Sequence, residues 1–162
     1  MKSLSFPLVL AVAGFAAPAL ADDDQVARGA YLVSIMDCTG CHTGRMADGA
    51  PDPNQYLTGA TIGFEMPDLG IFWPPNLTSD PTGIGDWSDE EVATAIRTGE
   101  RPDGRILAPI MPWMSYASLT DDDVAALVAY LRTLPPTENE VPAPVASGAE
   151  AVLPYFAFAV PQ

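Results

Sequence analysis

Residues 37–44 read DCTGCHTG, and this stretch holds both cysteines and the single histidine of the 162-residue chain. Cys38 and Cys41 are three positions apart, and His42 follows directly. Three kinds of site use such a grouping: a dithiol or disulfide redox pair, a metal site, and the covalent attachment of a haem. The rest of the sequence has to distinguish among them.

The pattern around the motif favours haem attachment. A redox C-x-x-C pair opens a helix after a strand, whereas this one follows a helical stretch and precedes loops. A structural zinc site takes four ligands, and no further cysteine or histidine exists in the chain. A spacing of three puts Cys38 and Cys41 on one face of a helical turn, where each can bond a planar haem while His42 lies beneath the iron. The dithiol and zinc sites remain as weaker alternatives.

The first 21 residues have the anatomy of a secretory signal peptide. Lys2 precedes an apolar run over residues 6–17, and a small-x-small pattern ends at Ala21. The alternative is a membrane anchor, but the run is short for a bilayer span and is interrupted by Pro7 and Gly14. We therefore expect cleavage near Ala21, a periplasmic mature protein, and no membrane span after cleavage.

The charge of the chain limits its partners. Seven lysine and arginine residues stand against 21 acidic ones, which gives a formal net charge of −14 at pH 7. Such a surface repels nucleic acid and attracts proteins that carry a basic docking surface. For most of the individual carboxylates, we expect only that they keep a secreted protein soluble.

Three helices are expected after the signal peptide. The first covers residues 22–37 with Asp24 as its N-cap, and the second begins with a capping box at Ser88 and ends at Gly99. The third begins after Thr120, whose hydroxyl is a good N-cap, and three aspartates in its first turn favour the helix dipole. The predicted buried face of this third helix comprises Val124, Leu127, Val128 and Leu131.

The other parts of the chain lack helical periodicity. Residues 43–86 are rich in Gly, Pro, Asn and Asp, and we expect loops that wrap around a large apolar cofactor. We predict one domain over residues 22–135, an extended and mobile Pro/Ala/Glu-rich spacer over 136–150, and an apolar C-terminal segment over 151–162. This last segment either folds back over the domain, which we favour, or docks a partner. Deletion of residues 136–162 is expected to weaken partner binding and to leave the haem spectrum unchanged.

Three stretches of the chain occur together in one protein family. They are GAYLVSIMDCTGCHTG, NLTSDPTGIGDWSDEEVATAIRTGERPDGR and MPWMSYASLTDDDVAALVAYLRTLP. In this order they resemble the class I c-type cytochromes, and more narrowly the monohaem cytochrome domains that serve bacterial dehydrogenases. The resemblance implies a mostly α fold of small helices and long loops around one covalently bound haem c. It also implies an electron carrier rather than an enzyme, passing single electrons from a dehydrogenase donor toward a downstream cytochrome or oxidase of the respiratory chain.

The second axial ligand of the iron follows from the same resemblance. With a single histidine, that position takes methionine, another weak ligand, or nothing. Met111 stands in APIMPWMSY, in the loop before the last helix, where the family places its distal ligand, and Met114 is its main rival. Pro109 and Pro112 flank Met111 and reduce the entropy lost when the loop is ordered. The alternative function is a five-coordinate haem protein that binds a gas or reacts with peroxide, which requires that Met111 not bind the iron.

Further residues match family positions, but they are not expected to bind the iron or to be attached covalently to the haem. Asn76 and Trp87 belong to a segment expected to line the haem edge, although ordinary packing is the alternative for Trp87. Gly29 and Tyr130 resemble the small and aromatic pair at which the terminal helices of the family cross.

The second nitrogen of His42 also needs a partner, because metal-binding histidines donate it to a carbonyl or a carboxylate. We expect that partner to be the carbonyl of either Pro51 or Pro53. Solvation at helix ends is expected for three arginines, with a contact to a haem propionate as the alternative: Arg97, Arg101 and Arg105.

Overall fold

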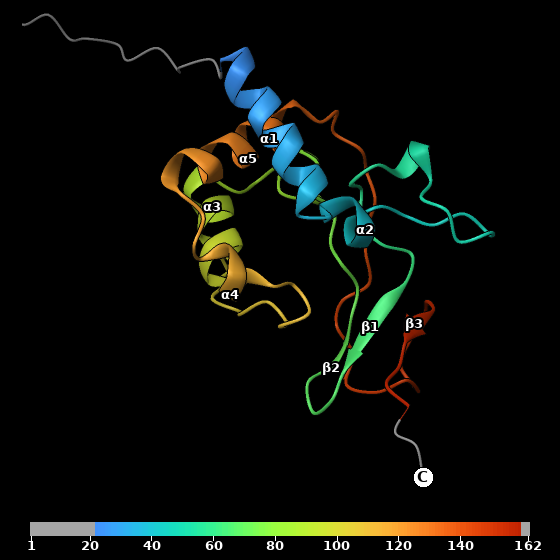
Figure 1. Ribbon diagram of the computed structural model, residues 1–162. Helices are drawn as coiled ribbons and strands as arrows, with labels where there is room; N and C mark the ends of the chain where they lie inside the picture. Colours follow the sequence, from blue (N-terminus) through green and yellow to red (C-terminus); the bar gives the residue numbers. More distant parts are fainter. Residues whose placement is uncertain (1–21, 160–162) are drawn as a thin grey trace, which may run out of the picture.

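The computed structural model describes residues 22–159 (Figure 1). The predicted signal peptide and the last three residues of the apolar C-terminal segment lie outside the described residues. Within residues 22–159 the secondary structure is mostly helical, with three short strands in addition. In chain order the elements are α1 (Asp23–Ile35), α2 (Cys38–His42), η1 (Pro53–Gln55), β1 (Gly63–Met66), β2 (Gly70–Phe72), α3 (Asp89–Thr98), α4 (Trp113–Tyr116), α5 (Asp121–Thr133) and β3 (Tyr155–Phe156).

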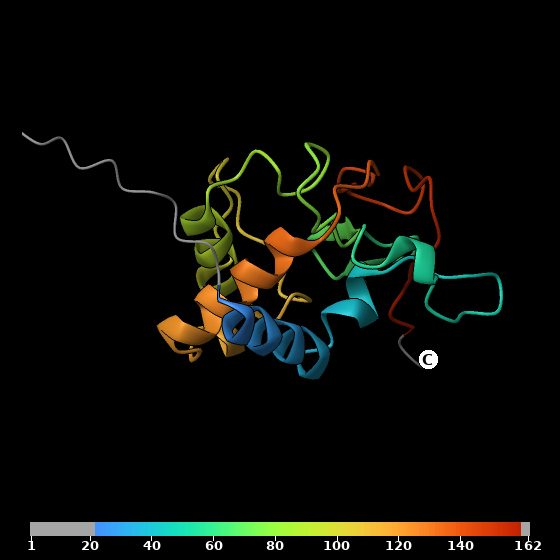
Figure 2. The same ribbon diagram turned by 90° about the horizontal axis from the view of Figure 1, so that it is seen from above.

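The helices and the strands occupy different sides of the molecule. In both views α3 and α4 lie on one side and the strands β1, β2 and β3 lie on the other (Figures 1 and 2). Helices α1 and α5 pack against each other, and α5 also contacts α3. The short helix α2 continues from the end of α1 and lies above the sheet in the view of Figure 1.

The crossing of α1 and α5 depends on a glycine. A Cβ atom at Gly29 would lie 2.0 Å from the carbonyl oxygen of Ala126 and 2.6 Å from the Cβ atom of Tyr130. Only a residue without a side chain therefore lets the two backbones approach this closely. Arg28 and Asp123 join the same helices through an ion pair, with 2.8 Å between Nη2 and Oδ1. The predicted pairing of Gly29 with Tyr130 is confirmed.

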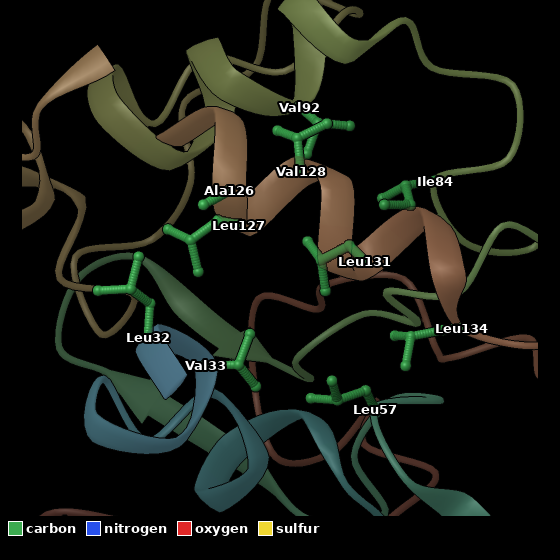
Figure 3. Packing of buried hydrophobic residues seen from close by; sticks show 10 residues of the cluster. All are labelled: Leu32, Val33, Leu57, Ile84, Val92, Ala126, Leu127, Val128, Leu131 and Leu134. Carbon is green, nitrogen blue, oxygen red and sulfur yellow. The ribbon is translucent and has the colours of Figure 1, made fainter. Parts of the chain in front are cut away.

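One apolar core fills the space between the helices and the segment that follows α2. Leu32 and Val33 of α1 face α5, and Val92 of α3 packs against it from the other side (Figure 3). The four residues predicted for the buried face of α5 are all buried. The core comprises Leu32, Val33, Leu57, Ile84, Val92, Ala126, Leu127, Val128, Leu131 and Leu134.

The local signals at the helix ends are confirmed with one exception. Ser88 and Glu91 form the predicted capping box, and Gly99 ends α3 in the left-handed conformation with φ 74°. The side chain of Thr120 accepts a hydrogen bond from the third backbone amide of α5. The prediction for α1 is wrong, because its N-cap is Asp22, which accepts from the backbone amide of Asp24. A run of three aspartates offers several side chains able to cap, and the backbone selects the first of them.

The loop-rich stretch after α2 contains secondary structure that its sequence did not predict. Strands β1 and β2 pair antiparallel, and β3 from the C-terminal segment adds parallel to β1, so the sheet order is β2-β1-β3. The rings of Phe64 and Phe156 lie 5.7 Å apart between centroids. The indole N–H of Trp73 donates to the carbonyl of Pro154 at 3.2 Å. The described part of the apolar C-terminal segment therefore folds back on the domain, which was the preferred expectation.

The segment that leads from α5 to β3 has no helix or strand over residues 135–144, and it is bonded to the domain at several points. Thr137 and Asn139 hydrogen-bond to side chains and backbone of the residue 58–82 region. Val145 exchanges two backbone hydrogen bonds with Ile71, at 2.8 and 3.1 Å. A Cβ atom at Gly70 would lie 2.4 Å from the carbonyl oxygen of Val145, so the chain passes close to the sheet edge. These contacts do not fit the mobile spacer that we expected.

Among residues 22–159, no helix combines the length and the apolar character needed to cross a membrane.

Candidate functional site

The C-x-x-C-H motif forms its own short helix. Asp37, with a left-handed φ of 55°, turns the chain between α1 and α2. A Cβ atom at Gly40 would lie 2.2 Å from a carboxylate oxygen of Asp37, so a side chain there would require the Asp37 carboxylate to move. Cys38 and Cys41 stand one helical turn apart on α2, both partly exposed and both free thiols. The two sulfurs therefore lie on the same face, as the spacing predicts.

The protonation of the thiols speaks against a dithiol redox site. Burial raises the pKa of the Cys38 thiol to about 11, and the nearby carboxylate of Asp37 adds to the effect. Burial, followed by the charge of Asp37, also raises the pKa of the Cys41 thiol. A redox C-x-x-C pair works through a thiol whose pKa is lowered, because the thiolate is the attacking form. Both thiols of this site are held in the protonated form at neutral pH.

The imidazole of His42 is buried and has a defined tautomer. Its Nδ1 lies 2.8 Å from the carbonyl oxygen of Pro75. Because a carbonyl only accepts, Nδ1 carries the hydrogen and donates it, and the lone pair of the ring is on Nε2. Burial lowers the pKa of the ring, against a smaller opposite effect of the hydrogen bond to Pro75, so the imidazole is neutral. A neutral imidazole with an oriented Nε2 is a metal ligand.

The predicted partner of His42 was wrong. Pro51 forms a bridge with Arg45 on an exposed loop, and Pro53 begins the 3-10 helix η1. The carbonyl comes instead from Pro75, 33 residues along the chain from His42. Its signal in the sequence is the pair Pro74-Pro75 immediately before the family segment NLT. Spacing from the motif alone did not identify it.

The backbone of His42 is held by a second segment. The amide of Gly59 donates to the carbonyl of His42 at 2.8 Å, and the amide of Leu57 donates to the hydroxyl of Thr43 at 3.1 Å. The amide of Ala60 donates to the carbonyl of Pro74 at 2.9 Å. Residues 57–60 therefore connect the histidine backbone to the segment that holds its ring.

Two hollows are lined by residues of the sheet together with residues of the motif in one case and of the Met111 loop in the other. A cavity of about 320 Å³ adjoins Cys41 and contains Phe64 of β1 and Phe156 of β3 in its wall. A smaller hollow of about 130 Å³ is lined by the same two phenylalanines and by Ile110, the neighbour of Met111. The first cavity is lined by Gly40, Cys41, Thr43, Arg45, Gly49, Ala60, Ile62, Phe64 and Phe156.

Arg45 is a residue of this site that sequence reasoning missed. Its Nη2 donates to the carbonyl of Gly40 within α2 at 2.6 Å, and the side chain lines the cavity beside Cys41. A guanidinium group at an apolar cavity is a suitable partner for a carboxylate such as a propionate. The signal available in the sequence was its position three residues after His42.

The loop that carries Met111 is anchored to the start of the motif. The indole N–H of Trp113 donates to the carbonyl of Leu107 at 3.2 Å, which closes the loop on itself. The hydroxyl of Tyr116 donates to the carbonyl of Met36 at 3.2 Å, just before Cys38. Met111 is partly buried and Met114 is 54% exposed. Tyr116 was also missed, although it lies in the quoted stretch MPWMSY.

Asn76 is fully buried, and its amide bonds to protein groups. Its side chain bonds to Thr82, Thr137 and Thr78. Trp87 is partly buried against the core, and the guanidinium of Arg101 lies over its ring at 5.0 Å. Asn76 directly follows the carbonyl that holds His42, whereas the contacts of Trp87 are those of packing.

The three arginines near α3 have different partners. Arg97 donates to the carbonyl of Leu119 and to the carboxylate of Asp121. Arg101 pairs with Asp103 at 3.3 Å, and Arg105 is exposed on the same loop. The Arg97 contacts hold the turn before α5.

These observations fit a covalently attached haem. Two thiols on one helical face, a neutral buried imidazole with a free Nε2, and an adjoining apolar cavity supply the chemistry that attachment needs. In addition, the apolar side chains of Ile106, Ile110 and Met114 are exposed on the loop around Met111, where a planar apolar ring would cover them.

Comparison with known proteins agrees with the geometry. Residues 26–135 match the family model described as Cytochrome c. The cytochrome subunit of fructose dehydrogenase from Gluconobacter japonicus is 41% identical over 118 residues, which cover 72% of this chain and 22% of that protein. The gluconate 2-dehydrogenase cytochrome c subunit of Pantoea cypripedii is 38% identical over 133 residues, 80% of this chain and 28% of that protein.

A diheme cytochrome c-type protein of Cereibacter sphaeroides is also similar, with 34% identity over 118 residues that cover 71% of this chain and 38% of that protein. The chain thus spans less than two fifths of the length of each of these three relatives. The family match runs from α1 through α5 and includes the C-x-x-C-H turn, the His42 partner and the Met111 loop. The mostly helical fold with its small sheet agrees with the class I form, and this chain belongs to the cytochrome c family.

Proposed function

We propose that this protein is a periplasmic monohaem electron carrier that takes single electrons from a dehydrogenase and passes them toward the respiratory chain. One observation carries the proposal: the buried imidazole of His42 donates Nδ1–H to Pro75 and keeps Nε2 for a metal, beside two thiols on one helical turn. The bound haem supplies a one-electron iron couple. The chain has a single C-x-x-C-H motif, which supports one haem.

Each site residue has a defined task in this proposal. Cys38 and Cys41 would hold the haem covalently, each through one thioether bond. His42 would hold the iron through Nε2, oriented by the Pro75 carbonyl. Met111 would be the second protein ligand of the iron, and its soft thioether would favour ferrous iron and raise the reduction potential. With His42 and Met111 both holding the iron, oxygen and peroxide would find no open position there, which supports electron transfer rather than catalysis.

The other predicted contacts of the haem are proposals of lesser weight. Trp87 remains a candidate for the haem edge, with packing under Arg101 as its observed contact. Asn76 belongs to the haem environment through Pro75, its neighbour in the chain. Arg45 is the cationic side chain that lines the cavity beside Cys41, and we propose it as the partner of a propionate.

The partner and the location follow from charge and from the relatives. Among the relatives are cytochrome subunits of fructose and gluconate dehydrogenases, which supports a dehydrogenase as the electron donor. The signal-like N-terminus supports export, and the net charge of −14 favours a partner with a basic docking surface. No interaction with nucleic acid is expected from this charge.

The test is the visible spectrum of the protein purified from a strain competent in haem attachment, beside Met111→Ala and the matched control Met114→Ala. We expect a low-spin c-type spectrum with a weak far-red iron–thioether band, and an intact mass that exceeds the polypeptide by one haem. Met111→Ala should lose the band and gain carbon monoxide binding, while Met114→Ala keeps the parent behaviour.

Other outcomes assign the site differently. If Met114→Ala loses the band and Met111→Ala keeps it, Met114 is the ligand. A parent protein that is already high-spin and binds carbon monoxide freely would replace the electron carrier with the five-coordinate haem protein. A mass without haem would remove the proposal altogether.

A further inference from the structure

We propose that residues 137–145, here called the C-terminal strap, position the proximal histidine by fixing the two segments that hold it. The strap acts through Asn76, Thr78 and Thr82 on the carbonyl of Pro75, and through Thr58 on the segment bonded to the His42 backbone. The proposal extends the proposed function, since it takes His42 to be the iron ligand. It assigns a role to a part of the chain beyond the end of the family match at residue 135.

The first contact is made by the buried amide of Asn76. Its Nδ2 donates to the carbonyl of Thr137 at 2.8 Å and to the hydroxyl of Thr82 at 3.1 Å, while its Oδ1 accepts from the amide of Thr78 at 2.9 Å. The residue is 0% exposed, so no water replaces a missing partner without rearrangement. The residue next to Pro75 is thereby tied to the strap.

Two threonine hydroxyls complete this attachment. Thr78 Oγ1 accepts from the amide of Thr137 at 3.2 Å. Thr82 Oγ1 accepts from the amide of Asn139 at 3.0 Å and from Asn76, and it donates to the carboxylate of Asp80 at 2.6 Å. A hydroxyl has one hydrogen and two lone pairs, so the capacity of Thr82 is fully used.

The strap also reaches the other segment around His42. The Nδ2 of Asn139 donates to the carbonyl of Thr58 at 2.8 Å, and the next residue, Gly59, donates its amide to the carbonyl of His42. A Cβ atom at Gly59 would lie 2.4 Å from Cγ2 of Val141, so the strap passes directly over this glycine. The strap therefore bonds to both segments that hold His42: the segment that contains Gly59, which holds its backbone, and the segment that contains Pro75, which holds its ring.

Pro75 needs such external support because of its chemistry. A proline has no N–H, so its own amide cannot anchor the carbonyl that accepts from His42. The position of that carbonyl is set by its neighbours, through the bond from Ala60 to Pro74 and the bonds of Asn76. A loosened strap lengthens the hydrogen bond from His42 Nδ1, lowers the basicity of the ligand, and so favours ferrous iron.

Deletion of residues 136–162 was expected to leave the haem spectrum unchanged, and the strap adds the expectation that the midpoint potential changes. Two truncated holoproteins separate the strap from the rest of the tail: one ends at Pro136, and the other ends at Ala146 and keeps the strap while it loses β3. Thr82→Val and Asn139→Ala break strap bonds within the full chain. Ser88→Ala, which breaks a hydrogen bond at the N-cap of α3, is the control for a general loss of stability.

Two quantities are measured: the midpoint potential, and the rate of solvent exchange of the His42 Nδ1–H by NMR. Thr82→Val, Asn139→Ala and the chain ending at Pro136 should exchange this proton faster and shift the redox equilibrium toward ferrous iron by about threefold or more. Ser88→Ala and the chain ending at Ala146 should match the parent. If the chain ending at Pro136 does not fold, the two point variants decide.

Equal shifts in Ser88→Ala, or parent values in both Thr82→Val and Asn139→Ala, would overturn the role of the strap. The proposed function fails separately, through a parent spectrum without a low-spin haem. In that case the exchange rate of Nδ1–H still tests the strap, because this rate depends on the bond to Pro75 and not on the iron.

Discussion

Replacing Gly29 with alanine tests the closest backbone contact of the fold. The new Cβ would lie 2.0 Å from the carbonyl oxygen of Ala126, against about 3.3 Å for an ordinary carbon–oxygen contact. The distance from the new Cβ to the Cβ of Tyr130, 2.6 Å, is short as well. Because both obstacles belong to or adjoin the α5 backbone, no rotation of a flexible side chain relieves them. Helices α1 and α5 must separate by about 1 Å.

The expected cost is set by two opposing effects. Overpacking of a tight interior costs about 1–3 kcal/mol and sometimes more, and a clash with backbone stands at the upper end. Alanine is favoured over glycine in a helix interior by about 1 kcal/mol, which offsets part of that cost. The separation also loosens the contacts of Leu32 and Val33 with α5. We therefore expect Gly29→Ala to lower the free energy of unfolding by at least about 2 kcal/mol.

The assay is urea unfolding of the holoprotein, monitored by far-UV circular dichroism. The dependence of the unfolding free energy on urea concentration should be the same in variant and parent, which checks two-state behaviour. Ser34→Ala is the matched control, because Ser34 is exposed on the same helix and its change alters propensity without a clash. It should stay within about 0.5 kcal/mol of the parent. A Gly29→Ala protein as stable as the parent would refute the close crossing of α1 and α5.

Two further predictions concern side chains that join distant parts of the fold. Arg132 donates to the carbonyls of Ile84 and Trp87 and pairs with Asp89. We therefore expect Arg132→Leu to lower the free energy of unfolding by about 2 kcal/mol, measured by thermal or urea unfolding. Asp89→Asn removes an exposed ion pair and one negative charge from the first turn of α3, and it should lower the free energy of unfolding by less than about 1 kcal/mol. Equal losses in the two variants would show that the carbonyl contacts contribute nothing. The hydrogen bond from Arg28, and then that from Thr120, lower the pKa of the Asp123 carboxyl in the folded protein. The contribution of Asp123 to the free energy of unfolding is therefore present above the pKa of the unfolded state. It is lost as the pH falls through the pKa of the folded state. The stability difference between the parent and Asp123→Asn should therefore be full at pH 7 and shrink below about pH 4, and a difference that stays constant into acid would contradict this assignment.

Much of the helical part of the fold could be predicted because its signals are local. The capping box of Ser88 and Glu91, the stop at Gly99 and the cap at Thr120 each involve residues within one helical turn. Their backbone preferences and hydrogen bonds are nearly independent of the rest of the molecule. The placement of Cys38, Cys41 and His42 on α2 is local in the same sense.

The support of the site was harder to predict because its partners are far apart in sequence. His42 and Pro75 are separated by 33 positions, and two prolines closer to the motif, Pro51 and Pro53, matched the chemistry equally well. A carbonyl acceptor has no residue-specific signature, since every residue carries one. Only the path of the chain shows which carbonyl reaches the ring. The bond of Tyr116 to Met36, across 80 positions, was missed for the same reason.

The sequence by itself determined the attachment motif, the helices α3 and α5 with their caps, the glycine at the α1–α5 crossing, and the candidate methionines. Each of these is written in residue types at short spacing, where backbone geometry leaves few choices. Only the tertiary structure decided that Pro75 holds His42, that residues 155–156 extend a sheet, and that the C-terminal strap is bonded where a mobile spacer was expected. These features rest on hydrogen bonds between residues far apart in the sequence, such as Gly63 with Pro154 and Thr58 with Asn139. Such bonds depend on which segments the core brings together, so no local pattern encodes them.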